Sequence, residues 1–299
     1  MKRRLFIQTA AAGVAAASAV SVNAQSESVD TNPVGLVNLT PQIKTSRVGF
    51  GTGVRAGMRN SNMHRMGNGI GVENMRYAYD CGIRFFDMAD SYGTHQFVAE
   101  ALKGKPRDSY TLSTKIWCYP GGGIPEKERL PADQLIERFL KELNTDYIDL
   151  INIHCLMSPD WVERFEYQFE PLEKLKKKGL IRAHGVSCHA RTAAEIAAKH
   201  PWVDSMHLRL NSEREKMDGD WDQNVAIAKT AKENGKGIII MKVLGEGSIN
   251  TPEGRKRSTI AVTRMPYKDV MIVGFEAKQH IDEFLENVAE GLALNQKKD

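Results

Sequence analysis

Short runs of apolar residues recur along the chain, and segments with a helical pattern separate them. The run Ile238-Ile-Ile-Met-Lys-Val243 contains a single charged residue, as expected for a strand that is buried on both faces of a parallel sheet. The other runs have similar lengths and alternate with helical segments. We therefore predict strands at residues 47–51, 84–88, 110–115, 147–154, 183–187, 204–210, 237–243 and 270–274.

Apolar residues at helical spacing occupy most of the intervals between these strands. The clearest example covers residues 131–143, where Pro131 opens a segment whose apolar positions recur every three or four residues, a pattern typical of an amphipathic helix. The remaining helices are predicted at residues 72–80, 96–103, 162–178, 192–199, 221–234 and 277–290.

The order of these elements predicts the fold class. Eight strands that alternate with helices favour a single α/β domain, a closed (β/α)8 TIM barrel, over an open doubly wound sheet. Gly67, Gly69 and Gly71 lack the spacing of a dinucleotide-binding Gly-x-Gly-x-x-Gly motif. We assign the barrel to residues 47–290 and a C-terminal tail to residues 291–299.

Four polar residues stand at or just beyond the ends of predicted strands. Asp87 and Tyr92 follow the run Ile83-Arg-Phe-Phe86, whereas Lys115 and His154 each end the strand that contains them. The carboxyl ends of the strands converge on one face of such a barrel, and that face carries the active site. An acid, a phenol, an amine and an imidazole on this face indicate proton transfer to or from a carbonyl compound.

These residues and their surroundings resemble the aldo/keto reductase family over residues 47–290. Phe86-Asp87-Met-Ala-Asp-Ser-Tyr92-Gly93 is similar to the family's signature around its catalytic Asp and Tyr, and Ser113-Thr-Lys115 matches the position of its Lys. Asp149-Leu-Ile-Asn-Ile-His154 is similar to the strand that ends in its His. Gly185-Val-Ser187, Asn211 and Met241-Lys-Val-Leu-Gly245 follow in the family's order.

The resemblance implies NAD(P)H-dependent reduction of a small aldehyde or ketone to an alcohol. Tyr92 would donate the proton, and an ammonium group on Lys115 beside it would lower the pKa of the phenol. Asp87 would hold Lys115 charged and in place. His154 would orient the carbonyl and stabilise the charge that develops on its oxygen.

Cofactor residues also follow from the resemblance, with departures from the family pattern. Cys188 stands where Asn is expected, His207 where Gln is expected, and Leu210 where an aromatic residue is expected. After the eighth strand, Glu276 would repel the 2′-phosphate of NADP, so NADP, NAD and loss of cofactor binding all stay open. The implied cofactor-binding residues are Ser187, Cys188, His207, Lys242, Gly274, Glu286 and Asn287.

The N-terminal residues have the layout of a secretory signal. Lys2-Arg3-Arg4 precedes an apolar, Ala-rich stretch from Ala10 to Val22, and small residues up to Ala24 permit cleavage. We predict that residues 1–24 form a twin-arginine-type signal peptide, recognised by the twin-arginine export machinery and removed, and that the protein is periplasmic. The stretch is shorter than the ~20 residues of a membrane span, so no stable anchor is expected. Residues 25–46 are predicted to form a linker.

Composition sets limits on the remaining functional classes. The net charge is +4, and no basic stripe interleaved with aromatic residues is present, so we expect no nucleic-acid partner. The four cysteines lack the spacing of a metal site, and no metal ligand is assigned. Cys155 and Cys188 are predicted on neighbouring strands, within the Cα–Cα distance of a disulfide, so a bond between them is left open.

Two alternatives to the reductase remain. Several histidines near strand ends, His154, His184, His189 and His207, leave a metal-dependent hydrolase on the same fold open. The altered cofactor positions leave open a catalytically reduced barrel that binds a small molecule without turnover.

Overall fold

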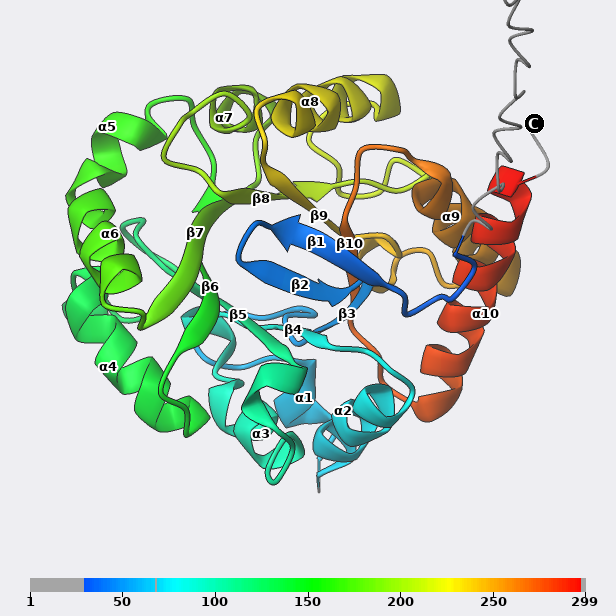
Figure 1. Cartoon of the computed structure of the whole chain (residues 1–299), viewed down its shortest axis with the longest axis horizontal. Helices are drawn as coiled ribbons and strands as arrows, with labels where there is room; N and C mark the ends of the chain where they lie inside the picture. The colour runs from blue at the N-terminus through cyan, green and yellow to red at the C-terminus, as the bar shows by residue number, and fades with distance from the viewer. Residues whose placement is uncertain (1–29, 68, 297–299) are drawn as a thin grey trace, which may run out of the picture.

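The computed structural model describes residues 30–67 and 69–296, and these residues contain the predicted barrel. Eight parallel strands close in the order β10-β3-β4-β5-β6-β7-β8-β9 (Figure 1). Their bounds are β3 Val48–Gly51, β4 Phe85–Asp87, β5 Thr111–Ile116, β6 Ile148–Leu156, β7 Ile181–Cys188, β8 Ser205–Arg209, β9 Gly237–Met241 and β10 Val270–Val273. Each lies within two residues of its predicted range, so the (β/α)8 prediction is confirmed.

Helices surround the barrel as an outer layer (Figure 1). They are α2 Ile70–Asp80, α3 His95–Ala101, α4 Ala132–Leu143, α5 Trp161–Phe165, α6 Phe169–Lys177, α7 Arg191–Ala197, α8 Trp221–Glu233, α9 Pro252–Arg264 and α10 Lys278–Gln296. The helix predicted at 162–178 is divided into α5 and α6, because Pro171 suits only the start of a helix. Helix α10 continues to Gln296, so most of the predicted C-terminal tail is helical.

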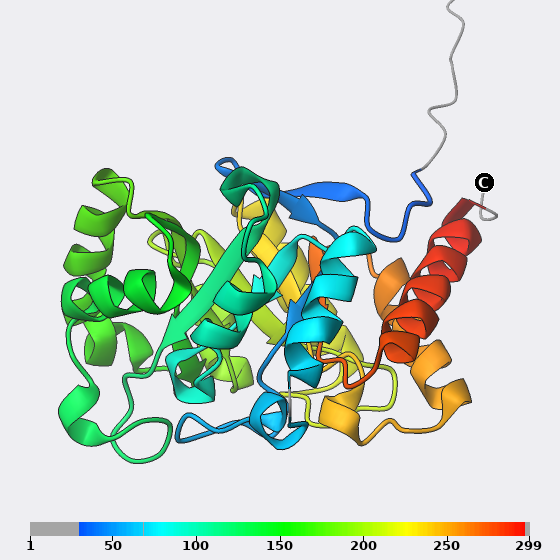
Figure 2. The ribbon, with the colours of Figure 1, turned by 90° about the horizontal axis from the view of Figure 1, so that it is seen from below.

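The prediction of a linker over residues 25–46 is wrong for its second half. Strands β1 (Leu36–Thr40) and β2 (Ile43–Ser46) form an antiparallel hairpin, with Pro41 in its turn. Leu39 and Ile43 are 2% exposed and pack with apolar residues of the barrel interior. The hairpin lies across one end of the barrel in Figure 1 and on top of it in Figure 2. It therefore closes this end of the barrel, and we call the hairpin, residues 36–46, the floor of the barrel.

The barrel interior changes from apolar to polar along its axis. Near the hairpin it contains Phe85, Leu150 and Ile239, which pack together with Leu39. Because side chains on a strand alternate between two faces, residues two positions further along the same strands also face inward. Those positions hold Asp87 on β4 and Asn152 on β6, both buried. The polar groups thus gather toward the end of the barrel opposite the hairpin.

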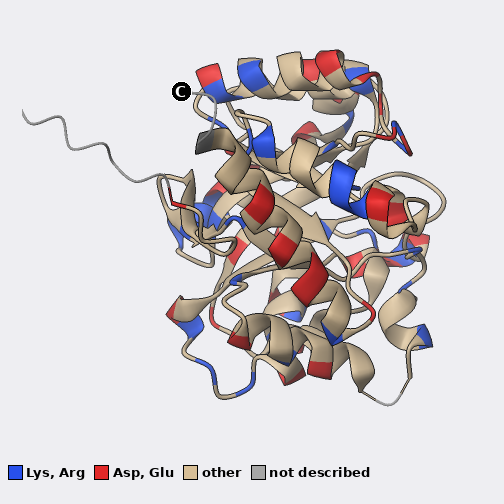
Figure 3. Cartoon of the chain, turned by 90° about the vertical axis from the view of Figure 1, so that its right-hand side faces the viewer, with Lys and Arg blue, Asp and Glu red and all other residues tan. Residues whose placement is uncertain are grey.

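Three further points concern the predicted signal peptide, the hydropathy of the helices and the charges on the surface. The predicted signal peptide, residues 1–24, is outside the described part of the chain. Among residues 30–67 and 69–296, no helix is both long and apolar enough to cross a bilayer. Figure 3 shows acidic and basic residues interspersed on the side that carries α9 and α10.

The contact between hairpin and barrel predicts the effect of one substitution. A Cβ atom at Gly237, the first residue of β9, would overlap the carbonyl oxygen of Leu39. We expect Gly237→Ala to lower the free energy of unfolding by about 1–3 kcal/mol, because backbone on both sides of the contact must shift. Urea unfolding followed by circular dichroism measures this.

The matched control is Gly57→Ala. No heavy atom lies within 4 Å of a Cβ at that position, and the residue is not among the glycines with positive φ. Equal free energies of unfolding for Gly237→Ala and Gly57→Ala would contradict a tight contact between the hairpin and β9.

Candidate active site

The four residues predicted to be catalytic meet at the polar end of the barrel. Asp87 is the last residue of β4, and Tyr92 ends the short 3-10 helix η1 (Asp90–Tyr92) that follows it. Lys115 lies on β5 and His154 on β6. Because β4, β5 and β6 are neighbours in the sheet, their carboxyl ends bring these side chains to one place.

Asp87 and Lys115 form a buried ion pair. Lys115 Nζ donates to Asp87 Oδ2 at 2.5 Å and to the carbonyl oxygen of Met88 at 2.7 Å. Burial opposes ionisation of Asp87, but Lys115 and His207 outweigh it and hold the pKa of the carboxyl below its ordinary value. Burial also lowers the pKa of Lys115, and Asp87 counteracts that effect. The geometry therefore supports a charged pair.

Tyr92 and His154 form the second half of the cluster. The Tyr92 hydroxyl lies 3.4 Å from Nε2 of His154, and Ser91 Oγ lies 3.3 Å from its Nδ1. Trp117 packs edge-on against the imidazole, with ring centroids 5.3 Å apart. Burial, followed by the positive charge of Lys115, holds the pKa of His154 well below its ordinary value. The imidazole is therefore neutral at pH 7.

The predicted effect of Lys115 on Tyr92 is not seen. Lys115 directs its hydrogen bonds to Asp87 and Met88, and its Nζ lies 5.2 Å from the centroid of the Tyr92 ring. Burial, and then the negative charge of Asp87, raise the pKa of Tyr92 well above its ordinary value. Tyr92 therefore keeps its proton and is a neutral phenol at pH 7.

Sequence reasoning missed a second set of charged groups that holds Tyr92 in place. Asp90, the first residue of η1, is 1% exposed and accepts from Arg59 Nε at 3.0 Å and from an Arg138 amino group at 2.7 Å. The backbone N–H of Arg59 also donates to the carbonyl oxygen of Ser91 at 2.8 Å. Asp90 lies in the motif around Asp87, but no spacing in the sequence connects it to either arginine.

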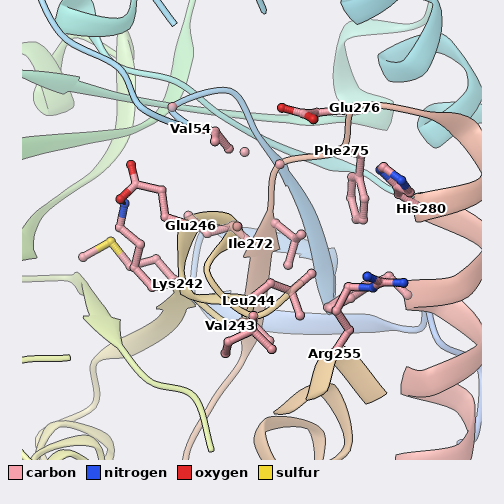
Figure 4. Close-up of a pocket in the computed structure, with 18 of the residues that line it drawn as sticks. Val54, Lys242, Val243, Leu244, Glu246, Arg255, Ile272, Phe275, Glu276 and His280 are labelled. Atoms are coloured by element: carbon pink, nitrogen blue, oxygen red, sulfur yellow. The ribbon is translucent and has the colours of Figure 1, made fainter. Parts of the chain in front are cut away.

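A cavity of about 350 Å³ opens beside Asp87 and Tyr92. Its walls come from the loops after β3, β9 and β10 and from the inner faces of α9 and α10 (Figure 4). Pockets of roughly 300–1,000 Å³ at the carboxyl ends of barrel strands are where such folds bind ligands. The cavity therefore extends from the polar cluster toward α10.

Charged groups stand at both ends of this cavity. Lys242 Nζ lies 3.1 Å from Glu246 Oε2, and the two side chains point toward one another in Figure 4. Burial opposes ionisation of Glu246, yet Lys242 and Lys216 lower its pKa to about 2. At the other end, Arg255 binds both carboxylate oxygens of Glu283, at 2.7 and 2.9 Å.

The structure divides the predicted cofactor-binding residues into two groups. Lys242, Gly274 and Asn287 line the cavity, and so do Glu276 and Glu283.

Ser187, Cys188 and His207 are buried and are not among the lining residues. Ser187 Oγ accepts from the backbone N–H of Cys155 at 2.8 Å, and His207 Nε2 lies 3.2 Å from Asp87 Oδ1.

Glu286, which is also predicted to bind the cofactor, does not line the cavity. Glu286 is exposed and is not among the lining residues, whereas Glu283 and Asn287 line the cavity. Residues four positions apart share a helix face, while Glu286 is turned about 100° from Asn287 around α10. Glu283, and not Glu286, is therefore the glutamate of this helix segment that reaches the cavity.

The cysteines and histidines form neither a disulfide nor a metal site in the described part of the chain. All four cysteines are free thiols, and burial raises the pKa of Cys155 to about 11. The ladder between β6 and β7 shifts register so that Cys188 pairs with Leu156. Across residues 30–67 and 69–296, no group of three or more His, Cys, Asp or Glu side chains could hold a metal ion. The hydrolase alternative thus has no ligand set there.

Known proteins with similar sequences cover part of the chain. It is 29% identical over 221 residues, 70% of its length, to "Probable aldo-keto reductase 1" of Glycine max, and 30% identical over 154 residues to "Methylglyoxal reductase DkgB" of Salmonella typhi. The second match covers 48% of this chain. The matches span 58% and 54% of those relatives, so the chain aligns with little more than half of each.

Solved structures show the same fold over most of the chain. The holo form of an aldo-keto reductase from Bacillus halodurans matches with a TM-score of 0.65 at 20% identity, covering 88% of this chain and 96% of that one. An aldo/keto reductase from Klebsiella pneumoniae in complex with NADP and acetate matches with a TM-score of 0.61 at 18% identity, covering 88% and 94%. The model of the aldo/keto reductase family matches residues 48–294, and the chain therefore belongs to the aldo/keto reductase family.

Proposed function

We propose that the protein reduces a small aldehyde or ketone to an alcohol with NADH or NADPH. The observation that carries the proposal is the meeting of a neutral phenol, a neutral imidazole and a buried ion pair at one end of an elongated cavity. A reduced nicotinamide, when bound, supplies the hydride in such a reaction. Membership in the aldo/keto reductase family and the NADP complex of the Klebsiella structure support this assignment.

The cavity walls suit a nicotinamide cofactor in their polar groups. Thr259 Oγ1 is buried at the wall and has no hydrogen-bond partner among the described residues. Lys242 provides a cation near the catalytic end, and Asn287 on α10 provides an amide. These groups would hold the phosphate and adenosine parts of the cofactor.

The side chains of the cluster account for the proton that the reaction needs. The carbonyl carbon gains a hydride, and its oxygen gains the proton of the Tyr92 hydroxyl. The phenol holds this proton at neutral pH, and the more basic alkoxide that develops on the carbonyl oxygen takes it up. His154 Nε2 orients the carbonyl oxygen, and the positive charge of Lys115, 5.2 Å from the ring, stabilises the phenolate as it forms.

Removal of the Tyr92 hydroxyl tests the proposal. We expect Tyr92→Phe to lower kcat for reduction of a small aldehyde such as methylglyoxal by roughly 10²–10⁴-fold, because the proton donor is lost. Nicotinamide absorbance measures the rate.

The control is Tyr167→Phe, which removes the hydroxyl of a tyrosine that is 51% exposed and is not among the residues that line the cavity. A Tyr92→Phe variant that keeps half of the wild-type rate would refute the assignment of Tyr92.

The far end of the cavity predicts the preferred cofactor. Glu276 lines this end, and the cation there, Arg255, is engaged by Glu283. A carboxylate favours a bare ribose over a 2′-phosphate. We therefore expect NADH to bind more tightly than NADPH, and Glu276→Gln to tighten NADPH by roughly 3- to 10-fold through loss of like-charge repulsion. Cofactor fluorescence measures both affinities.

Glu286→Gln is the matched control, since it removes an exposed carboxylate from α10, the helix that follows the loop with Glu276. Equal effects of Glu276→Gln and Glu286→Gln would contradict a local role for Glu276. Failure of the wild-type protein to bind either cofactor at millimolar concentration would support the catalytically reduced barrel instead.

We also propose that the protein acts in the periplasm after twin-arginine export. The support is the sequence around Arg3 and Arg4, followed by the short apolar stretch. We expect replacement of both arginines by lysine to retain the protein in the cytoplasm, because the export machinery recognises the arginine pair. Cell fractionation and N-terminal sequencing measure this, and an exported double-Lys variant would contradict the route.

A further inference from the structure

His207 contacts the catalytic carboxylate from the opposite side of the barrel. It lies on β8, the sixth strand of the barrel, and its side chain is fully buried. Its Nε2 lies 3.2 Å from Oδ1 of Asp87, a residue 120 positions earlier in the chain. The resemblance implied a cofactor contact here, but His207 is not among the residues that line the cavity.

The hydrogen bonds of Asp87 define the role of this contact. Oδ2 accepts from Lys115 at 2.5 Å, whereas Oδ1 accepts from Ser113 Oγ at 3.1 Å and from His207. An ionised carboxylate can only accept hydrogen bonds, so Nε2 of His207 must carry the proton in this contact. Three donors from two other strands, β5 and β8, thus hold a single carboxylate.

Charge balance explains why an imidazole suits this position. The charged and titratable groups that face His207 are Asp87, Lys115 and His154. A neutral His207 leaves the buried group with one negative and one positive charge, whereas a protonated His207 would add a second cation beside Lys115. Burial lowers the pKa of His207 more than Asp87 raises it, which favours the neutral form.

We propose that His207 is a positioning residue: it donates from Nε2 to Asp87 and thereby keeps Lys115 in place beneath Tyr92. The proposal rests on the reductase function proposed above. Without this donor, Oδ1 of Asp87 retains Ser113 alone, and the carboxylate is free to rotate away from Lys115. Small displacements of catalytic groups have large effects on rate, roughly 10²-fold for 1 Å.

Two substitutions separate positioning from cofactor binding. His207→Gln keeps an N–H donor at about the distance of Nε2, whereas His207→Leu fills a similar volume without a donor. We expect the Leu variant to lower kcat by roughly 10-fold or more and the Gln variant to stay within about 3-fold of wild type. The dissociation constants for NADH and NADPH, measured by fluorescence, should change less than 2-fold in both.

His184→Gln is the control for removal of a buried imidazole. His184 lies on β7, stacks on Trp202 and contacts Glu173, which places it away from the four catalytic residues. We expect kcat of this variant to equal that of wild type. Urea unfolding of all three variants shows whether each is folded at the assay temperature.

A spectroscopic measurement tests the contact without any turnover. Proton–nitrogen spectra of protein labelled with ¹⁵N-histidine distinguish the two neutral tautomers and the protonated ring, and His207→Gln assigns the signal. We expect His207 to be neutral with the proton on Nε2 from pH 6 to pH 8. If the wild-type protein shows no reductase activity, this measurement still shows whether Nε2 of His207 carries the proton that it would donate to Asp87.

Specific results would overturn the proposal. A protonated ring or a proton on Nδ1 would show that His207 does not donate to Asp87 as inferred. An altered cofactor dissociation constant in the Leu variant, with kcat at saturating cofactor unchanged, would show that His207 contributes to cofactor binding and not to the position of Asp87. Equal loss of kcat in the Gln and Leu variants would show that the hydrogen bond from Nε2 of His207 does not by itself account for the effect on kcat.

Discussion

The buried ion pair between Asp87 and Lys115 is the interaction on which the arrangement of the barrel interior depends. Two charges removed from water are tolerated only when hydrogen bonds satisfy them, and loss of one partner of such a pair costs about 3–5 kcal/mol. Ser113, His207 and the carbonyl oxygen of Met88 supply those bonds. The pair therefore requires polar residues on several strands at this level, while the levels below it remain apolar.

This requirement connects the ion pair to Tyr92 and His154. Asp87 ends β4, and η1 begins three residues later, so the position of the carboxylate also sets the start of the segment that carries Tyr92. Asp90 then ties that segment to Arg59 and Arg138. Electrostatic contacts on both sides of Tyr92 thus leave its hydroxyl facing His154 without a direct bond from Lys115.

The barrel and the meeting of Asp87, Tyr92, Lys115 and His154 could be predicted from sequence because their signals are local. Apolar runs reveal strands, and polar residues at strand ends reveal the functional face. The hairpin was missed because Leu39 and Ile43 are its only buried apolar residues, within a segment that is otherwise mostly polar. Helix α9 was missed because its residues are mostly polar. The contact of His207 with Asp87 joins residues 120 positions apart, so only the closure of the barrel brings it about. The position of Glu286 depends on the rotation of α10, which its motif does not specify.

The hairpin floor has a consequence for how the protein can be attached to other molecules. It seals the end of the barrel opposite the cavity, and Figure 2 shows that both ends of the described chain lie on the hairpin side. The loops that form the cavity lie on the other side. A tag, a surface linkage or a fusion partner joined at either end of the described chain therefore leaves the approach to Tyr92 open, which makes the protein suitable for immobilisation through its termini.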